Sequence, residues 1–125
     1  MRYEVGTAVS LHALHRMPVE GPEGELHEHE YRLEVVVARD DLDAQGMVVD
    51  LERLDDDLEA VRSELEGNDL EAIRPTDAEA VTVEVFARWV HERLAPTIRH
   101  SGGGELLVRV YESPVAFGGY RATVS

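Results

Sequence analysis

The sequence contains no cysteine and no lysine, and each absence narrows what the protein can be. Without cysteine, no disulfide can stabilise the fold, and a bound metal has to take its ligands from histidine and carboxylate side chains. All 12 basic residues are arginine, against 26 aspartates and glutamates, which leaves a formal charge of −14. Because nucleic acids and anionic membranes bind clustered cations, we expect neither as a partner.

Long apolar runs are also missing, both within the chain and after basic residues at its start. We therefore expect no membrane span and no signal peptide, and predict a cytoplasmic protein. The 125 residues fit one domain covering positions 1–125, and an apolar content of 43% is ordinary for a folded chain. The lysine-free, carboxylate-rich composition favours a salt-adapted (halophilic) source, although a GC-rich genome would also replace lysine by arginine.

Two strands are expected in the first third of the chain. One face of the first, over residues 5–15, is formed by alternate positions: Val9, Leu11, Ala13 and His15. A turn-rich stretch from Pro18 to Gly24 follows. Residues 27–37 then alternate cleanly between apolar and charged side chains, which predicts the second strand.

Two helices are expected in the middle of the chain. A three-and-four spacing follows Asp50, a residue suited to the N-cap, and forms one apolar stripe: Leu51, Leu54, Leu58, Val61 and Leu65. The second helix begins between Thr76 and Thr82 and runs towards Pro96. Thr76 and Glu79 could form a capping box, so the sequence leaves the start of this helix open.

Two further strands are expected near the end of the chain. After the glycine triplet at 102–104, one strand face carries alternate residues: Leu106, Val108, Val110 and Glu112. A last short strand is expected between Tyr120 and Val124, after Gly118-Gly119. The order strand, strand, helix, helix, strand, strand predicts an α+β protein, with a four-stranded antiparallel sheet (ββααββ) and two helices on one face.

Three histidines occupy the ends of the expected core-facing strand surfaces. His27 and His29 are two residues apart, so both side chains leave the same face, and His15 ends the corresponding face of the first strand. If the two strands pair, the three imidazoles converge in the three-ligand arrangement of a catalytic zinc, with a fourth position open. His12 points to the opposite face. Partly exposed histidines at a strand end are the structural alternative.

The segments around these histidines resemble the 6-pyruvoyl-tetrahydropterin and 6-carboxy-tetrahydropterin synthases. Residues 11–17 (Leu-His-Ala-Leu-His-Arg-Met) are similar to that family's Phe-x-Ala-Ala-His-Arg-Leu, and residues 27–31 (His-Glu-His-Glu-Tyr) to its His-Gly-His-x-Tyr. Residues 46–51 resemble its Gly-Met-Val-x-Asp-Phe, residues 82–90 its Thr-x-Glu-x-x-Ala-x-Trp helix, and residues 108–113 its Val-x-Val-x-Glu-Thr strand. The order and spacing of these motifs cover nearly the whole chain.

This resemblance implies a tunnelling (T-fold) protein that binds Zn²⁺ through His15, His27 and His29. It further implies a small pterin as substrate, bound by Glu112 with Thr82 and Glu84. A pocket completed between subunits would require a homo-oligomer, a hexamer of two trimers. The implied reaction is that of a lyase acting on 7,8-dihydroneopterin triphosphate. Independently of the resemblance, a carboxylate at the end of an apolar face, as at Glu112, requires a partner or a ligand.

The chain departs from the family pattern at three places. Glu23 stands where the synthases carry a proton-abstracting cysteine, and Glu66 and Gly67 stand where they carry an Asp-His pair. Glu28 replaces the middle glycine of His-Gly-His and should point away from the ligands. A subgroup with glutamate in the cysteine position releases 6-hydroxymethyl-dihydropterin, which makes Glu23 a candidate general base.

Several alternatives remain open at this level. Glu25 could act as the base instead of Glu23, or both could belong to a solvated acidic loop. Asp69 or His91 could replace the missing Asp-His pair. Loss of the cysteine and the histidine could also leave a zinc- and pterin-binding module without catalysis, or a T-fold protein without metal.

Overall fold

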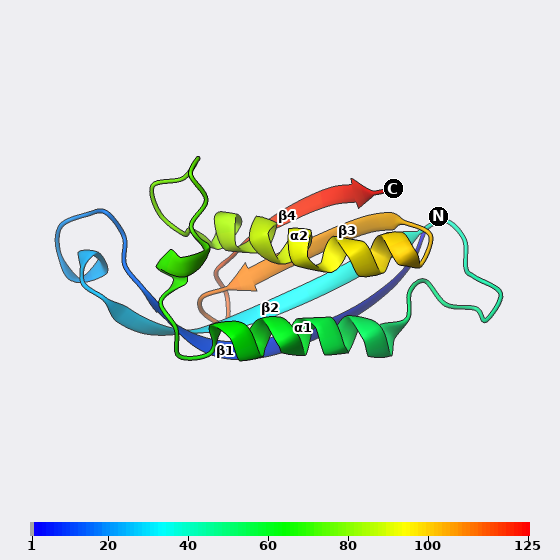
Figure 1. Ribbon diagram of the computed structural model, residues 1–125, viewed down its shortest axis with the longest axis horizontal. Coiled ribbons are helices and arrows are strands. Elements are labelled where there is room, and N and C mark those ends of the chain that lie inside the picture. Colours follow the sequence, from blue (N-terminus) through cyan, green and yellow to red (C-terminus); the bar gives the residue numbers. More distant parts are fainter. Residues whose placement is uncertain (1) are drawn as a thin grey trace.

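The computed structural model describes residues 2–125, which form a four-stranded antiparallel sheet with both long helices on one face (Figure 1). The elements are β1 (Tyr3–His15), β2 (His27–Arg39), α1 (Leu51–Leu65), α2 (Val83–His100), β3 (Gly104–Tyr111) and β4 (Phe117–Val124), with short 3₁₀ helices η1 (Pro22–Gly24) and η2 (Leu70–Ile73). The strands lie in the sheet in sequence order. The α+β, ββααββ expectation is confirmed.

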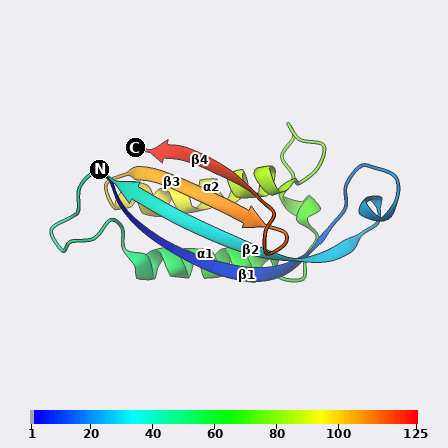
Figure 2. The same ribbon diagram turned by 180° about the vertical axis from the view of Figure 1, so that it is seen from behind.

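The core lies between the sheet and the two helices. Alternate residues of β2, among them Leu33, Val35 and Val37, are buried. Four of the five residues in the predicted stripe of α1 are buried against the core, and α1 packs onto β1, whereas Leu51 at the start of the helix is exposed. α2 packs onto β3 and β4. Within residues 2–125, no helix covers the opposite face of the sheet (Figure 2). No helix within residues 2–125 combines the length and apolarity needed to cross a membrane.

Both helices begin at a side-chain N-cap. Asp50 accepts a hydrogen bond from the backbone N–H of Arg53 (3.3 Å), as the sequence predicts. Thr82 accepts from the N–H of Val85 (3.2 Å), so α2 begins at Val83, and the possible capping box at residues 76–79 does not start a helix. The reason is tertiary: Val81 is buried, which holds the preceding segment against the core in a non-helical conformation.

Several element boundaries differ from the sequence expectation. β1 begins two residues early and β2 ends two residues late, whereas β3 ends at Tyr111, so that Glu112 is an exposed residue just after the strand and not part of its apolar face.

α2 continues through Pro96 to His100. Proline has no N–H to donate to the carbonyl of Glu92, four residues earlier. Both residues are exposed, so water can bind this carbonyl instead. β4 begins at Phe117, three residues early, because Gly118 pairs with Val110 and continues the ladder. Gly118 also lets α2 approach, since a Cβ there would lie 2.6 Å from Val83 Cγ2.

β1 and β2 extend beyond the rest of the sheet at one end. β3 pairs with β2 only from Arg32 onwards, whereas β1 pairs with β2 as far as the His15–His27 pair. The free edge of β1 is partly covered there, since the N–H of Leu14 donates to the carbonyl of Asn68 (2.9 Å). This two-stranded extension, which the connection through η1 closes, carries the three histidines.

Candidate metal centre and adjoining pocket

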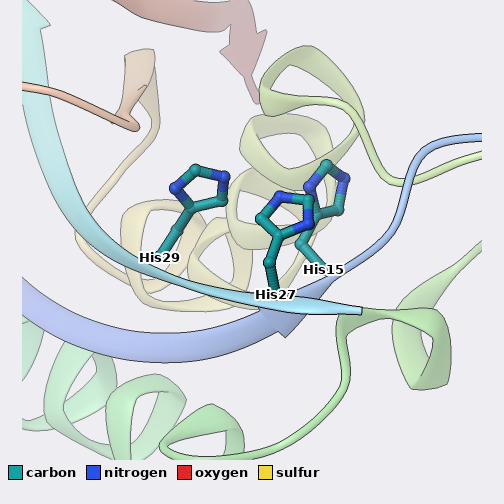
Figure 3. Close-up of side chains that lie close together, drawn as sticks. All are labelled: His15, His27 and His29. Carbon is teal, nitrogen blue, oxygen red and sulfur yellow. The ribbon is translucent and has the colours of Figure 1, made fainter. Parts of the chain in front are cut away.

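The strand register brings the three predicted ligands together. His15 is the Cα partner of His27, and His29 pairs with Ala13, two residues before His15. The three rings project from the same side of the strand pair (Figure 3). One ring nitrogen from each residue lies within 4.8 Å of the other two. Because tetrahedral zinc binds imidazole nitrogen at about 2.0–2.1 Å, only small side-chain rotations are needed to place all three around one ion.

Three ring nitrogens of these histidines lack a hydrogen-bond partner, as expected for atoms that bind a metal. His15 is only 7% exposed, yet neither of its ring nitrogens has a hydrogen-bond partner among residues 2–125, and the same is true of Nε2 of His27. A buried polar atom without a partner costs on the order of 1–3 kcal/mol. An ion between the rings would satisfy these nitrogens, which is why their convergence indicates a binding site.

A backbone contact determines which nitrogen of His27 can bind the metal. Its Nδ1 lies 2.7 Å from the carbonyl oxygen of Glu25. A carbonyl only accepts, so Nδ1 carries the proton and donates, which leaves the lone pair on Nε2 facing the other two rings. Such an outer hydrogen bond holds the ring of a metal-ligating histidine in orientation.

Electrostatics also favour the ligating form of His15. Burial, and then the neighbouring His27, lower the pKa of His15 below its ordinary value. Metals bind only the neutral imidazole, so a lowered pKa keeps His15 ready to bind at a more acidic pH than an exposed histidine.

A pocket of about 250 Å³ opens beside the histidines. It is lined by residues from β1, β2, α2 and the segments next to them: His15, Met17, Glu23, Tyr31, Val81, Thr82, Val83, Glu84, Phe86 and Glu112. All four residues that the sequence analysis named as catalytic or substrate-binding, Glu23, Thr82, Glu84 and Glu112, therefore line one cavity together with His15, a candidate metal ligand. The cavity is concave and partly apolar, as small-molecule sites usually are.

The two candidate bases differ in position. Oε2 of Glu23 lies 3.5 Å from Nε2 of His27, and Glu23 lines the pocket. Glu25 contributes its backbone carbonyl to His27, whereas its exposed side chain is not among the lining residues. The geometry therefore favours Glu23 over Glu25.

The possible replacements for the Asp-His pair are separated from one another. Asp69 lines a second pocket, of about 360 Å³, which His15 also lines. His91 lies 3.3 Å from the carbonyl of Ala122 and lines neither pocket. Glu66 accepts a hydrogen bond from the N–H of His12 (2.9 Å) and is likewise outside both pockets.

Tyr31 is a pocket residue that the sequence analysis treated only as part of a motif. It is buried, its ring contacts His29 and Phe86, and its position two residues after His29 places it on the ligand face. Burial, together with the negative charges of Glu112 and Glu23, raises the pKa of the Tyr31 hydroxyl. The hydroxyl therefore remains a hydrogen-bond donor at neutral pH. Strand alternation alone could have placed it there.

Comparisons with known proteins agree with this architecture. A 6-pyruvoyl tetrahydropterin synthase from Caenorhabditis elegans is 21% identical, with a TM-score of 0.77, over 98% of this chain and 96% of that chain. The synthase from Plasmodium vivax is 14% identical, with a TM-score of 0.78, over 99% of each chain. A variant of the P. vivax protein, 14% identical over 99% of each chain with a TM-score of 0.75, carries cysteine in place of a glutamate described as a catalytic residue.

At sequence identities of 14–21%, likeness to these solved structures establishes only the fold. The family has to be established from a match to the sequence. No curated protein matches the sequence. The family model described as 6-pyruvoyl tetrahydropterin synthase, however, matches residues 4–123, almost the whole chain. That match covers His15, His27 and His29 and every residue that lines the pocket. The chain therefore belongs to the 6-pyruvoyl tetrahydropterin synthase family.

Proposed function

We propose that this protein is a zinc-dependent lyase that breaks a carbon–oxygen or carbon–carbon bond in the three-carbon side chain of 7,8-dihydroneopterin, for which the family resemblance implies the triphosphate form. The possible products are the 6-hydroxymethyl, 6-pyruvoyl and 6-carboxy pterins. One observation carries the proposal: three imidazoles converge, and one of them, His15, lines a pocket together with Glu23 and Glu112.

The pocket offers the groups that a pterin ring requires. A pterin presents adjacent N–H donors on its guanidine-like edge, and the carboxylate of Glu112 can accept two of them. Thr82 already accepts from Val85, so its hydroxyl proton remains available for donation. Tyr31 supplies a second hydroxyl, and Phe86 an apolar wall. We assign substrate binding to Glu112, Thr82 and Glu84.

Catalysis is assigned to Glu23, held beside His15, His27 and His29. When bound, zinc supplies a Lewis acid that lowers the pKa of the hydroxyls on the substrate side chain. Glu23 then removes a proton at the end of the pocket where its carboxylate meets His27. A catalytic glutamate in the P. vivax relative supports a carboxylate in this role.

A zinc- and pterin-binding module without catalysis is the alternative. It is favoured by Glu66 and Gly67, which stand where the family carries an Asp-His pair. Within residues 2–125, His15 is the only histidine that lines either pocket, and the proposal already uses it as a metal ligand.

One experiment separates the two functions. Zinc-loaded protein is incubated with 7,8-dihydroneopterin triphosphate and with its dephosphorylated form, and the pterin products are identified by mass. A pterin product with a hydroxymethyl, pyruvoyl or carboxy side chain supports the lyase. Bound but unchanged pterin supports the binding module, and absence of both binding and conversion rejects both functions.

We also propose a homo-oligomer, a hexamer of two trimers. The outer edge of β4 has no strand partner within residues 2–125, and most of the outer edge of β1 is equally open. Unpaired edges of this length favour pairing with another chain.

A further inference from the structure

Tyr31 carries a hydroxyl group that has no partner inside the protein. Its side chain is only 2% exposed, yet it lines the pocket of about 250 Å³. Within residues 2–125 this hydroxyl forms no hydrogen bond, so its proton is available to a molecule in the pocket. Buried hydroxyls normally have a partner, because leaving them without one costs free energy. The free hydroxyl therefore indicates that a bound ligand supplies the acceptor.

Two aromatic contacts hold the ring of Tyr31 in place. Its centroid lies 5.7 Å from that of His29, at an interplanar angle of 65°. The centroid of the Phe86 ring, on α2, lies 5.4 Å away at an angle of 67°. Edge-to-face contacts of this kind favour one orientation of the ring. The hydroxyl is thus presented to the pocket in a defined position before a ligand arrives.

The strand register places Tyr31 between the metal centre and Glu112. The last pair that β2 forms with β3 is Arg32–Tyr111, so Tyr31 and Glu112 are the next residues outward on the two chains. His29 follows two residues further along β2 in the same direction. A pterin held by Glu112, with its side chain at the histidines, therefore lies against Tyr31.

Both bond-breaking routes of the proposed lyase place negative charge on the same ring atom. In the carbon–oxygen route, Glu23 first takes the proton of C1′. In the carbon–carbon route, Glu23 takes the proton of the C2′ hydroxyl, the C1′–C2′ bond breaks, and C2′ leaves as an aldehyde carbon. In either route the electron pair remains on C1′ and is delocalised through the C6=N5 double bond of the 7,8-dihydropterin onto N5. No oxidant or reductant is needed, and a donor at N5 stabilises both routes.

We propose that the hydroxyl of Tyr31 donates a hydrogen bond to N5 of the pterin ring and that Tyr31 is a catalytic residue. This inference rests on the proposed lyase function and adds the group that stabilises the developing charge. Tyr31 keeps its proton throughout and acts as a neutral donor. The hydrogen bond strengthens as N5 becomes negative, so it stabilises the transition state more than the bound substrate. The pocket carboxylates Glu23, Glu84 and Glu112 cannot take this role, because an ionised carboxylate only accepts.

Tyr31→Phe tests the role, since it removes the hydroxyl and keeps the ring that packs on His29 and Phe86. With zinc-loaded protein and whichever form of 7,8-dihydroneopterin it converts, kcat should fall about 100-fold, as for the loss of one oxyanion donor. The Kd for the pterin should rise only about twofold to tenfold, the effect of one neutral hydrogen bond. Tyr120→Phe makes the same change on β4 outside the pocket and should leave both constants within about twofold. Zinc content and Tm should be unchanged in both variants.

A ligand without N5 identifies the atom that accepts the hydrogen bond. In 5-deazapterin a C–H group replaces N5 of pterin, and neither compound has a side chain to cleave, so titration calorimetry measures binding alone. The unmodified protein should bind pterin about twofold to tenfold more tightly than 5-deazapterin, and this preference should disappear in Tyr31→Phe.

The outcomes separate this inference from the lyase function. A kcat of Tyr31→Phe within about threefold of the unmodified protein would overturn the inference and leave the lyase assignment intact. The same holds if the unmodified protein does not prefer pterin, or if the preference persists in Tyr31→Phe, which would assign N5 to another donor such as the first turn of α2. If the unmodified protein converts no form of dihydroneopterin, the lyase function and the catalytic role of Tyr31 are rejected together.

Discussion

The carboxylate of Glu23 lies 3.5 Å from Nε2 of His27, the nitrogen that the hydrogen bond between Nδ1 and the Glu25 carbonyl leaves unprotonated. The proposed base and a proposed metal ligand therefore lie next to each other, with Glu23 also lining the pocket. A carboxylate there can remove a proton from a substrate group next to the metal, or complete the metal coordination in the absence of substrate.

Replacing this carboxylate tests its role. Glu23→Gln preserves shape but removes the base, so kcat should fall by about 100- to 10,000-fold while pterin affinity persists. Glu25→Gln, two residues away with an exposed side chain, is the control and should keep activity within a few-fold. Activity of the Glu23 variant within a few-fold of the unmodified protein would exclude this residue as the base, and a loss of bound zinc in that variant would make it a ligand instead.

The three histidines predict the metal content. His27→Ala should abolish stoichiometric zinc, measured by elemental analysis after extensive dialysis, because two imidazoles do not complete a three-ligand site. His12→Ala is the matched control, since His12 lies on the other face of β1, between Glu30 and Glu66, and should leave the zinc content unchanged. Undiminished zinc in the His27 variant would disprove the assignment.

The lowered pKa of His15 predicts a pH dependence of the metal-free protein. The unfolded chain binds a proton at this histidine more readily than the folded chain does. The contribution of His15 to the free energy of unfolding is therefore fully present above about pH 6.5, and it is lost as the pH falls below that value. Thermal melts between pH 7.5 and 5 should therefore show a smaller loss in His15→Gln than in the unmodified protein. His100→Gln, at an exposed position, should follow the unmodified protein, and identical profiles for all three would contradict the prediction.

Glu112 should control ring binding rather than chemistry. Glu112→Gln removes a charge-assisted acceptor, so pterin affinity should weaken by about 1.5–3 kcal/mol, roughly tenfold to 150-fold in Kd by titration calorimetry. Glu4→Gln, on an exposed part of β1, is the control for a change in net charge. Unchanged affinity in the Glu112 variant would show that another part of the pocket binds the guanidine-like edge of the pterin.

The open sheet edges predict self-association. Light scattering at high salt, where repulsion between chains of charge −14 is screened, should give the mass of a hexamer. A monomer over a broad concentration range under those conditions would contradict the proposed oligomer.

The amino-acid sequence by itself determined the local features of this protein. Alternation in β2 and the stripe of α1 follow from the spacing of neighbouring side chains, and that spacing places His27 and His29 on one face whatever the rest of the chain does. The same alternation places Tyr31, two residues after His29, on that face as well. Capping by Asp50 is equally local, since donor and acceptor are three residues apart.

Only the tertiary structure decided which distant residues meet. The register that aligns His15 with His27 depends on how the whole β1–β2 pair forms, and Glu23 reaches His27 through a turn that has no periodic pattern. Glu112 and Thr82 join the same pocket because α2 and β3 pack on the core, and burial of Val81 sets where α2 begins. Turn conformations and the packing of remote segments depend on contacts between residues that are far apart in the sequence. Short-range sequence patterns do not encode these contacts.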